Sequence, residues 1–307
     1  MDYYGQAESE LKARVAAKAA ENIRRIDEFG QKSPEFASVT EELDRTGLEL
    51  VKAGMAGLRT DSGPIAAHLA ELEAKRLALL AEGGLSDIAD GGYYCPVCKD
   101  RGYVSTEKGE RRCGCFVRIY SDILSKNDSS WDHSVRFKDF RTDFYPEEAR
   151  MDVFLKHCVR FAEEFPSAEN KNMLFTGNAG LGKTYMASIL TNEIIEKGIP
   201  AMYLKASEMF YGVSQMGDRE LRDRICSVPF LVIDDLGREK QSDTRFADLL
   251  DILDSREALH RAKGLATVIS TNLGPREIMS FYDERISSRL LGDYDVIRFS
   301  GKDLRLT

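Results

Sequence analysis

The chain has 307 residues, and its 43 lysines and arginines against 51 aspartates and glutamates give a formal net charge of −8 at pH 7. A protein that is acidic overall does not bind nucleic acid through its bulk charge, so any such contact must be local. The sequence has no run of about 18 apolar residues and no signal peptide at its start. These features predict a cytoplasmic protein with no membrane partner, long enough for about two domains.

Residues 1–90 are rich in Ala, Leu, Glu, Lys and Arg, which predicts helices rather than strands. Apolar residues at helical spacing indicate three helices packed as hairpins, and a Gly-Gly pair at 83–84 ends the third. The segment is net acidic, which fits either a solvated face or a docking surface for a basic partner. The apolar positions are Leu11, Val15, Ile23 and Ile26, then Leu43, Leu50, Val51, Met55 and Leu58, and finally Ile65, Leu69, Leu72 and Leu79.

Four of the six cysteines lie close together in a block from about 91 to 120. They form one Cys-x-x-Cys pair and one Cys-x-Cys pair, with fourteen residues between the pairs. In a reducing compartment this spacing indicates a metal site rather than disulfides. Four thiolates in a tetrahedral arrangement suit a structural Zn²⁺ ion, with a short hairpin strand at Tyr103-Val104 between the pairs. The predicted zinc ligands are Cys95, Cys98, Cys113 and Cys115.

Two other interpretations of this block remain open. A redox-active Cys-x-x-Cys pair and an iron–sulfur centre use similar spacings, although no thioredoxin-like βαβ pattern surrounds Cys95. The block is net basic, which fits contact with nucleic acid or with an acidic partner surface. The two remaining cysteines, Cys158 and Cys226, lie in apolar surroundings, and we interpret them as buried core thiols.

The segment 121–150 is a polar connector with an unusual number of aromatic residues. It contains the polar run 126–130 and Trp131, the only tryptophan of the chain. We expect the aromatic side chains to pack on the edge of the following domain. Besides Trp131 they are Phe137, Phe140, Phe144 and Tyr145. A helix is predicted from about 147 to 165.

Apolar strands and helices alternate from residue 172 onward, which predicts a parallel sheet with helices on both faces. The predicted strands cover residues 173–176, 201–204, 230–233, 266–270 and 296–299. Charged residues between the second and third strands are candidate contacts for single-stranded DNA, although such residues are often only solvated. They are Lys205, Arg219, Arg222 and Arg224.

A Gly-x-x-x-x-Gly-Lys-Thr phosphate-binding loop follows the first of these strands, at residues 177–184. Its glycines let backbone N–H groups point at phosphate oxygens, because a Cβ would block the close approach. We expect Lys183 to contact the β- and γ-phosphates and Thr184 to complete a Mg²⁺ shell, above the N-terminal end of a helix. The predicted nucleotide-binding residues are Gly177, Asn178, Ala179, Gly180, Leu181, Gly182, Lys183, Thr184 and Tyr185.

Polar residues end two later strands of the predicted sheet, at the edge that faces the ligand crevice. We expect Asp234 to hold Mg²⁺, mostly through water, and Asp235 to orient and polarise the attacking water. Asn272 closes the next strand with an amide side chain suited to sensing the γ-phosphate or the water. The alternative for all three residues is an ordinary turn after a core strand.

Two arginines, Arg285 and Arg289, lie four residues apart on one face of a later predicted helix. Arginine stays charged and presents a fixed fork of donors, so an exposed pair near a subunit boundary fits an arginine finger that acts on a neighbouring subunit. The alternative is that both arginines only form ion pairs at the surface. The position of the pair after Asn272 favours the finger.

Taken together, this order of motifs resembles the AAA+ ATPases that load replicative helicases, the DnaC/DnaI group. The helical segment followed by the four-cysteine module resembles the DnaI-like branch of that group. The resemblance implies an α/β P-loop AAA+ parallel-sheet ATPase domain without a C-terminal lid at 151–307. It also implies a helical partner-binding region at 1–90, a small zinc-ribbon module at 91–120 and a linker at 121–150.

The function implied by this resemblance is ATP-dependent loading of the hexameric replicative helicase onto single-stranded DNA, in replication initiation or restart. The N-terminal region would grip the helicase, and the chain would assemble into an oligomer when ATP is bound. The implied cofactors are ATP, Mg²⁺ and Zn²⁺, and ATP hydrolysis would be weak alone and stimulated by assembly or DNA. The implied catalytic residues are Lys183, Asp235, Asn272, Arg285 and the less certain Arg289, with Thr184 and Asp234 as Mg²⁺ ligands.

The sequence departs from the AAA+ pattern in two places. Asp235 stands where glutamate is common, and its shorter reach would slow hydrolysis. Only eight residues follow the last predicted strand, so we expect no helical lid, no sensor-two arginine and a loosely held nucleotide in the monomer. Two alternative functions remain: a transposition helper ATPase of the IstB kind, against which the zinc module argues, and an adaptor in which ATP binding only stabilises a scaffold.

Overall fold

The computed structural model describes residues 3–55, 63–107, 109–125, 131–167, 169 and 172–306. The polar run 126–130 and the predicted apolar position Leu58 lie outside the described residues, as does the side chain of Met55. The chain divides into two compact units, one of residues 8–110 and one that joins residues 1–7 to residues 111–307.

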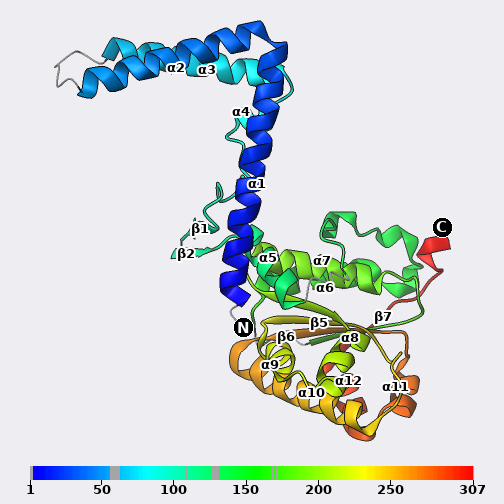
Figure 1. Ribbon diagram of the computed structural model, residues 1–307. Helices are drawn as coiled ribbons and strands as arrows, with labels where there is room; N and C mark the ends of the chain where they lie inside the picture. The colour runs from blue at the N-terminus through cyan, green and yellow to red at the C-terminus, as the bar shows by residue number, and fades with distance from the viewer. Residues whose placement is uncertain are drawn as a thin grey trace. The chain divides into compact units, whose positions relative to one another are not determined.

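The N-terminal unit is helical, as predicted (Figure 1). Its elements are α1 (Tyr3–Lys32), α2 (Pro34–Met55), α3 (Gly63–Glu82) and the short α4 (Ser86–Ala89). Helices α2 and α3 pack against each other as a hairpin. Phe36 and Leu80 are almost fully buried, and the ring of Phe36 meets Phe29 edge to face at 5.1 Å between ring centroids. This small apolar core joins the first three helices.

The predicted apolar stripes are wrong at two positions of these helices. Ile23 is 61% exposed and Val51 is 58% exposed. The contact face of α1 is set instead by polar partners in the segment around α4: Asn22 Nδ2 donates to the carbonyl oxygen of Gly92 at 2.6 Å, and Arg25 binds Asp87 through both guanidinium nitrogens at 2.6 and 3.0 Å. Apolar spacing alone does not indicate such polar contacts, so Ile23 falls outside the contact face of α1, although Leu11 of the same stripe is buried.

A two-stranded sheet of β1 (Tyr103–Thr106) and β2 (Gly109–Arg112) follows, and it confirms the predicted hairpin strand. Helix α5 (Gly114–Leu124) comes next and lies against the edge strand of the large sheet. The hydroxyl oxygens of Ser121 and Ser125 accept hydrogen bonds from the backbone N–H groups of Ala201 and Tyr203, at 3.1 and 3.2 Å. Helix α5 thus provides acceptors for two backbone N–H groups on the outer edge of β4, which would otherwise be unpaired.

The large sheet has five parallel strands in the order β4-β5-β6-β3-β7, which confirms the predicted α/β class. The strands are β3 (Asn172–Thr176), β4 (Ala201–Lys205), β5 (Phe230–Leu236), β6 (Ala266–Thr271) and β7 (Tyr294–Arg298), and the last begins two residues before its predicted start. Side chains of β3, β5 and β6 are buried on both faces, as expected for a parallel sheet between helices.

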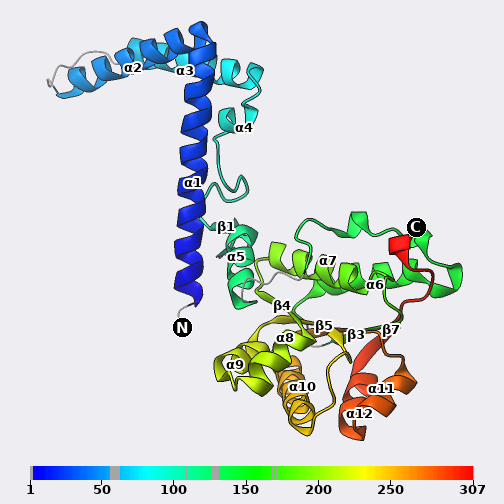
Figure 2. The same cartoon turned by 45° about the vertical axis from the view of Figure 1, so that its right-hand side comes forward.

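Helices cover both faces of this sheet (Figure 1 and Figure 2). Helices α5, α6 (Met151–Glu164) and α7 (Lys183–Glu196) lie on one face. The other face carries α8 (Ala206–Phe210), α9 (Arg219–Ser227), α10 (Asp243–Lys263), α11 (Pro275–Phe281) and α12 (Glu284–Gly292). The strand that precedes the phosphate loop is therefore enclosed between two helical layers.

The described part of the connector, from Trp131 to Arg150, consists of 3₁₀ turns held by one buried side chain of α7. Asn192 Nδ2 donates to the carbonyl oxygens of Asp132 and Val135 at 2.8 and 3.0 Å. Its Oδ1 accepts from Trp131 Nε1 at 3.3 Å and from Arg118 at 3.1 Å. The same helix that starts at the phosphate loop thus fixes the connector in place.

Candidate functional site

The phosphate loop joins β3 to α7 at residues 177–182, with Lys183 as the first residue of the helix. Gly177 has a φ of +129°, and a Cβ there would lie 2.2 Å from the carbonyl oxygen of Phe299. Gly182 has a φ of +85°, and a Cβ there would lie 2.6 Å from the hydroxyl of Tyr145. Only glycine fits both positions, because each combines a left-handed backbone with a close neighbour.

The side chain of Lys183 is 95% buried beside the loop, since its relative exposure is 5%. Its Nζ donates to the carbonyl oxygens of Gly177 and Asn178, both at 2.7 Å, and to Asn272 Oδ1 at 2.9 Å. Burial lowers the pKa of this ammonium, while the nearby Asp235 and Asp234 carboxylates oppose the change. The structure thus brings the predicted phosphate lysine and the predicted sensor asparagine into direct contact.

The carboxylate of Asp234 is buried at the end of β5 and receives hydroxyl donors from two other elements. Thr184 Oγ1, on the first turn of α7, lies 3.1 and 3.2 Å from its two oxygens. Ser270 Oγ, on β6, also donates to Asp234. A carboxylate beside a threonine hydroxyl is a hard oxygen donor set, so these residues fit Mg²⁺.

Asp235 stands next in the strand and has a strained backbone. Its φ is +58°, which a residue with a Cβ adopts only at a cost on the order of 1 kcal/mol. Its N–H donates to Ser270 Oγ at 3.0 Å, and its carboxylate pairs with Arg238 at 3.2 Å. Asp235 lines the cavity that the loop borders, whereas Asp234 does not.

These residues surround one cavity of about 610 Å³. One wall is the phosphate loop, from Ala179 to Thr184, and another is formed by Asp235 and Asn272. The connector supplies an aromatic wall, as the sequence predicted, with Phe140 stacked on Tyr145 at 5.7 Å between ring centroids. The remaining lining includes Arg141, Phe144, Tyr185, Ser188, Arg238, Leu304 and Arg305.

Three arginines at this cavity were not predicted from the sequence: Arg141, Arg238 and Arg305. Arg305 belongs to the segment after β7, which folds back so that the Leu304 N–H donates to the carbonyl oxygen of Gly180 at 2.9 Å. Its guanidinium is held by both carboxylate oxygens of Asp303, at 3.0 and 2.9 Å. No sequence motif includes these residues, so their place at the cavity is visible only in the folded chain.

The two arginines of α12 lie away from the cavity and do not line it. Arg289 Nε binds Asp254 of α10 at 2.6 Å, which raises the pKa of the guanidinium. Arg285 is exposed, and within the described residues its side chain has no hydrogen bond or ion pair. A single chain therefore does not place either arginine near the phosphate loop.

Of the four cationic side chains between β4 and β5 that are candidate DNA contacts, two make contacts within the chain. Arg222 binds Asp251 at 2.7 Å, and the guanidinium of Arg224 lies 4.5 Å from the ring centroid of Tyr3. Lys205 and Arg219 are exposed at the end of β4 and the start of α9. Two of the four predicted cations are thus engaged in contacts within the chain.

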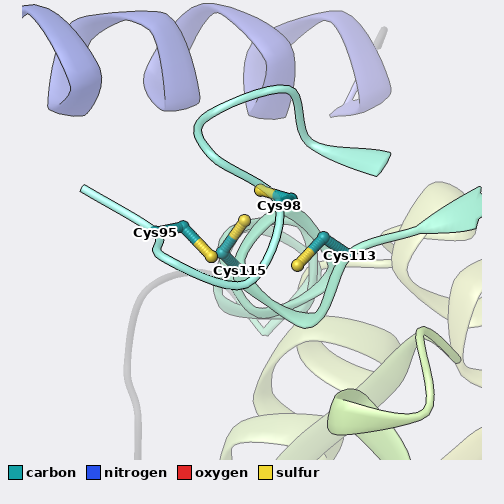
Figure 3. Close-up of side chains that lie close together, drawn as sticks. All are labelled: Cys95, Cys98, Cys113 and Cys115. Carbon is teal, nitrogen blue, oxygen red and sulfur yellow. The ribbon is translucent and has the colours of Figure 1, made fainter. Parts of the chain in front are cut away.

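The four clustered cysteines converge (Figure 3). Their sulfur atoms all lie within 4.8 Å of one another, and three of the four residues are buried. A Zn–S distance of about 2.3 Å places the sulfurs of a tetrahedral site about 4 Å apart, so one zinc ion fits. The Gly102 N–H donates to Cys98 Sγ at 3.4 Å, and the Asp100 carboxylate accepts from the Cys95 N–H at 2.8 Å. These bonds shape the turn that carries the first two thiols.

The other two cysteines are outside this cluster. Cys158 is fully buried in α6, and burial raises the pKa of its thiol well above its usual value. Cys226, near the end of α9, packs against the apolar core as expected but is only half-buried. Its apolar sequence neighbours had suggested full burial, but the last turn of α9 leaves part of the side chain at the surface.

The order of the parallel strands and the glycine loop between β3 and α7 define a phosphate-loop ATP-binding protein of the AAA+ type. Residues 159–306 match the model of the family described as IstB-like ATP binding protein. This part of the chain is similar to IstB-like ATP binding proteins, and it has distant relatives named DnaC.

Two relatives are named replicative helicase loader DnaC. The protein of Buchnera aphidicola subsp. Schizaphis graminum is 28% identical over 146 residues, which cover 44% of this chain and 56% of the relative. The protein of Escherichia coli K12 is 23% identical over 160 residues, which cover 50% of this chain and 62% of the relative. The chain thus spans somewhat more than half the length of these relatives.

Solved structures similar to this chain include DnaI and the DnaC helicase loader. The DnaI structure has a TM-score of 0.47 and 22% identity, covering 56% of this chain and 92% of DnaI. The DnaC structure has a TM-score of 0.46 and 20% identity, covering 54% of this chain and 96% of DnaC. Within the described residues, no helix is both long and apolar enough to cross a membrane.

Proposed function

We propose that this protein is a cytoplasmic ATPase that loads a hexameric replicative helicase onto single-stranded DNA. The observation that carries the proposal is the convergence of Lys183, Asn272, Thr184 and Asp234 at the end of one parallel sheet. The names of the relatives support the helicase as partner. In this proposal residues 1–90 contact the helicase and residues 91–120 form a zinc module. Residues 121–150 link the zinc module to the ATPase domain at 151–307. ATP binding promotes assembly of the chains into an oligomer.

The chemistry assigned to each residue follows from its place at the cavity. Lys183 exchanges two backbone carbonyls for phosphate oxygens, and the backbone N–H groups of the loop bind the same phosphates. Thr184 and Asp234 hold Mg²⁺, which neutralises charge on the β- and γ-phosphates. Asp235 accepts a hydrogen bond from the attacking water, and Asn272 contacts that water or the γ-phosphate.

The aromatic wall of the connector is proposed to contact the nucleotide base. Tyr145 donates to the carbonyl oxygen of Leu181 at 2.8 Å, so the wall is fixed to the phosphate loop. Phe144 is 52% exposed at the cavity, and the guanidinium of Arg141 lies 4.9 Å from its ring centroid. An exposed ring beside a loop that holds phosphates offers a stacking surface for the base.

The proposal is tested with the full chain, a bacterial hexameric replicative helicase and single-stranded DNA. We expect a helicase complex that forms with ATP, detected by size-exclusion chromatography, and an ATPase rate that rises severalfold with helicase and DNA. Asp235→Asn should retain the complex but lose turnover, because the neutral amide no longer polarises water. A protein that ignores the helicase in both assays contradicts the proposal.

The matching family model gives a second candidate its support, because that model is named for an IstB-like protein. A transposition helper would be stimulated by a transposase on duplex DNA and not by a helicase.

A further alternative is an adaptor that needs only ATP binding. In that case Asp235→Asn should support full helicase loading without ATP turnover.

Arg285 is proposed to act on the nucleotide of a neighbouring subunit. Mixing Lys183→Ala chains with Arg285→Ala chains should restore about one quarter of wild-type ATPase activity, because random assembly gives that share of intact interfaces. Each variant alone should be inactive. The control is Arg261→Ala, because Arg261 is an exposed arginine of α10 that pairs with Glu257 of the same helix, and the variant should keep full activity. A mixture no more active than its components contradicts an action between subunits.

A further inference from the structure

Arg238 lines the nucleotide cavity, although no sequence motif includes it. Its side chain is 66% exposed, and its Nη1 donates to Asp235 Oδ2 at 3.2 Å. Burial lowers the pKa of the Lys183 ammonium, and the positive charge of Arg238 is near enough to lower it further. Arg238 therefore lies at the end of the cavity that holds the phosphate lysine and the residue expected to polarise water.

The turn that carries Arg238 is fixed on both sides of this residue. Gly237 has a φ of +93°, and a Cβ there would lie 2.6 Å from Cδ1 of Leu273. The Gly237 N–H donates to one carboxylate oxygen of Glu239 at 2.8 Å. The hydroxyl of the buried Tyr282 donates to the other oxygen of the same carboxylate. The backbone around Arg238 is thus held in place, while its side chain stays accessible to a ligand.

The pair of Arg238 with Asp235 is one that a ligand can exchange. Both side chains are partly exposed, at 66% and 36%, and an ion pair with this exposure contributes little to stability. The terminal phosphate of ATP carries more negative charge than a carboxylate, and its oxygens match the donor fork of a guanidinium. A γ-phosphate beside Lys183 would therefore compete with Asp235 for Arg238, whereas ADP offers no such group.

This exchange would change what Asp235 can do. While Arg238 donates to its carboxylate, part of the negative charge is neutralised and one acceptor position is occupied. The place of Asp235 at the cavity has a support of its own, because its N–H donates to Ser270 Oγ at 3.0 Å. Transfer of Arg238 to a phosphate would leave the carboxylate in position and free to accept a hydrogen bond from water.

We propose that Arg238 binds the γ-phosphate of ATP in its own subunit and leaves Asp235 when that phosphate enters the cavity. Arg238 then distinguishes ATP from ADP, and Asp235 is released only when there is a γ-phosphate to attack. This role differs from that proposed for Arg285, which acts on the nucleotide of a neighbouring subunit. The inference rests on the proposed function in one respect, namely that the cavity binds ATP.

The test is Arg238→Gln, which removes the charge but keeps a polar side chain. Calorimetry on the full chain with Mg²⁺ measures the Kd of the β,γ-imido analogue of ATP and the Kd of ADP. The first should rise at least about tenfold, the loss expected for a hydrogen bond between charged groups, and the second should change less than about twofold. Arg238→Lys should give an intermediate loss, because it keeps the charge without the fork. The melting temperature without nucleotide should stay at the wild-type value.

Arg141→Gln is the matched control, because Arg141 also lines the cavity and pairs with a nearby carboxylate, that of Asp143 at 2.6 Å. Arg141 lies beside the ring of Phe144 in the aromatic wall, so this variant should change both Kd values by the same factor. Equal changes in the two Kd values of Arg238→Gln, or no change in either, overturn the inference alone. A wild-type chain that binds neither nucleotide overturns the proposed function, and the inference with it.

Discussion

Replacing Lys183 by alanine should lower ATP turnover by at least about 100-fold, the loss typical of removing one electrostatic donor from a preorganised site. The effect is expected to be this large because the ammonium is buried beside the loop, where water screens its charge poorly. Turnover is measured by phosphate release at saturating Mg²⁺, and ATP affinity by equilibrium binding. Both should fall, because the proposed contact of the lysine with phosphate would exist before and during the reaction.

The same substitution also removes contacts of the ligand-free protein, so a control for stability is required. Lys197 follows the opposite end of α7, and its Nζ donates to the carbonyl oxygens of Ala162, Glu163 and Phe165, each at 2.7 Å. Burial lowers the pKa of this lysine as well. Lys197→Ala should therefore lower the melting temperature yet leave ATP binding intact. Equal losses of turnover in the two variants would reject a phosphate role for Lys183.

The phosphate loop could be located from sequence because its backbone conformation requires particular residue types at fixed positions. A left-handed turn that meets a neighbouring carbonyl requires glycine at Gly177, whatever the rest of the chain does. The apolar runs before Asp234 and Asn272 also indicate buried strands, each followed by polar residues. In a parallel sheet such strand ends meet at one edge, so their convergence was predictable.

The rest of the cavity depends on contacts between distant segments, which no local pattern encodes. Arg305 reaches the phosphate loop only because the chain after β7 folds back onto Gly180. Tyr203 belongs to an apolar strand, and its spacing explains the buried ring but not the stacking of that ring on Trp131. Arg285 is exposed on α12, so its position in the sequence indicates no contact partner.

Replacing Cys98 by serine should remove about one zinc ion per chain and unfold the segment that carries the four thiols. Cys98 is fully buried in the cluster, and structural zinc contributes on the order of 10 kcal/mol to small sites of this kind. Elemental analysis measures the zinc, and limited proteolysis locates new cleavage sites. Cleavage should concentrate between residues 95 and 115, where the described residues form two short strands and the turn at Asp100.

The control is Cys226→Ser, which alters a half-buried thiol outside the cluster and should retain both zinc and protease resistance. The damage in Cys98→Ser should extend to α5, whose first turn begins after Cys113. Arg118 of α5 binds Glu196 of α7 at 2.6 Å, so loss of this turn should also lower the melting temperature of the ATPase domain. Iron–sulfur absorbance in the wild type, or a full zinc content in Cys98→Ser, would exclude the structural zinc site.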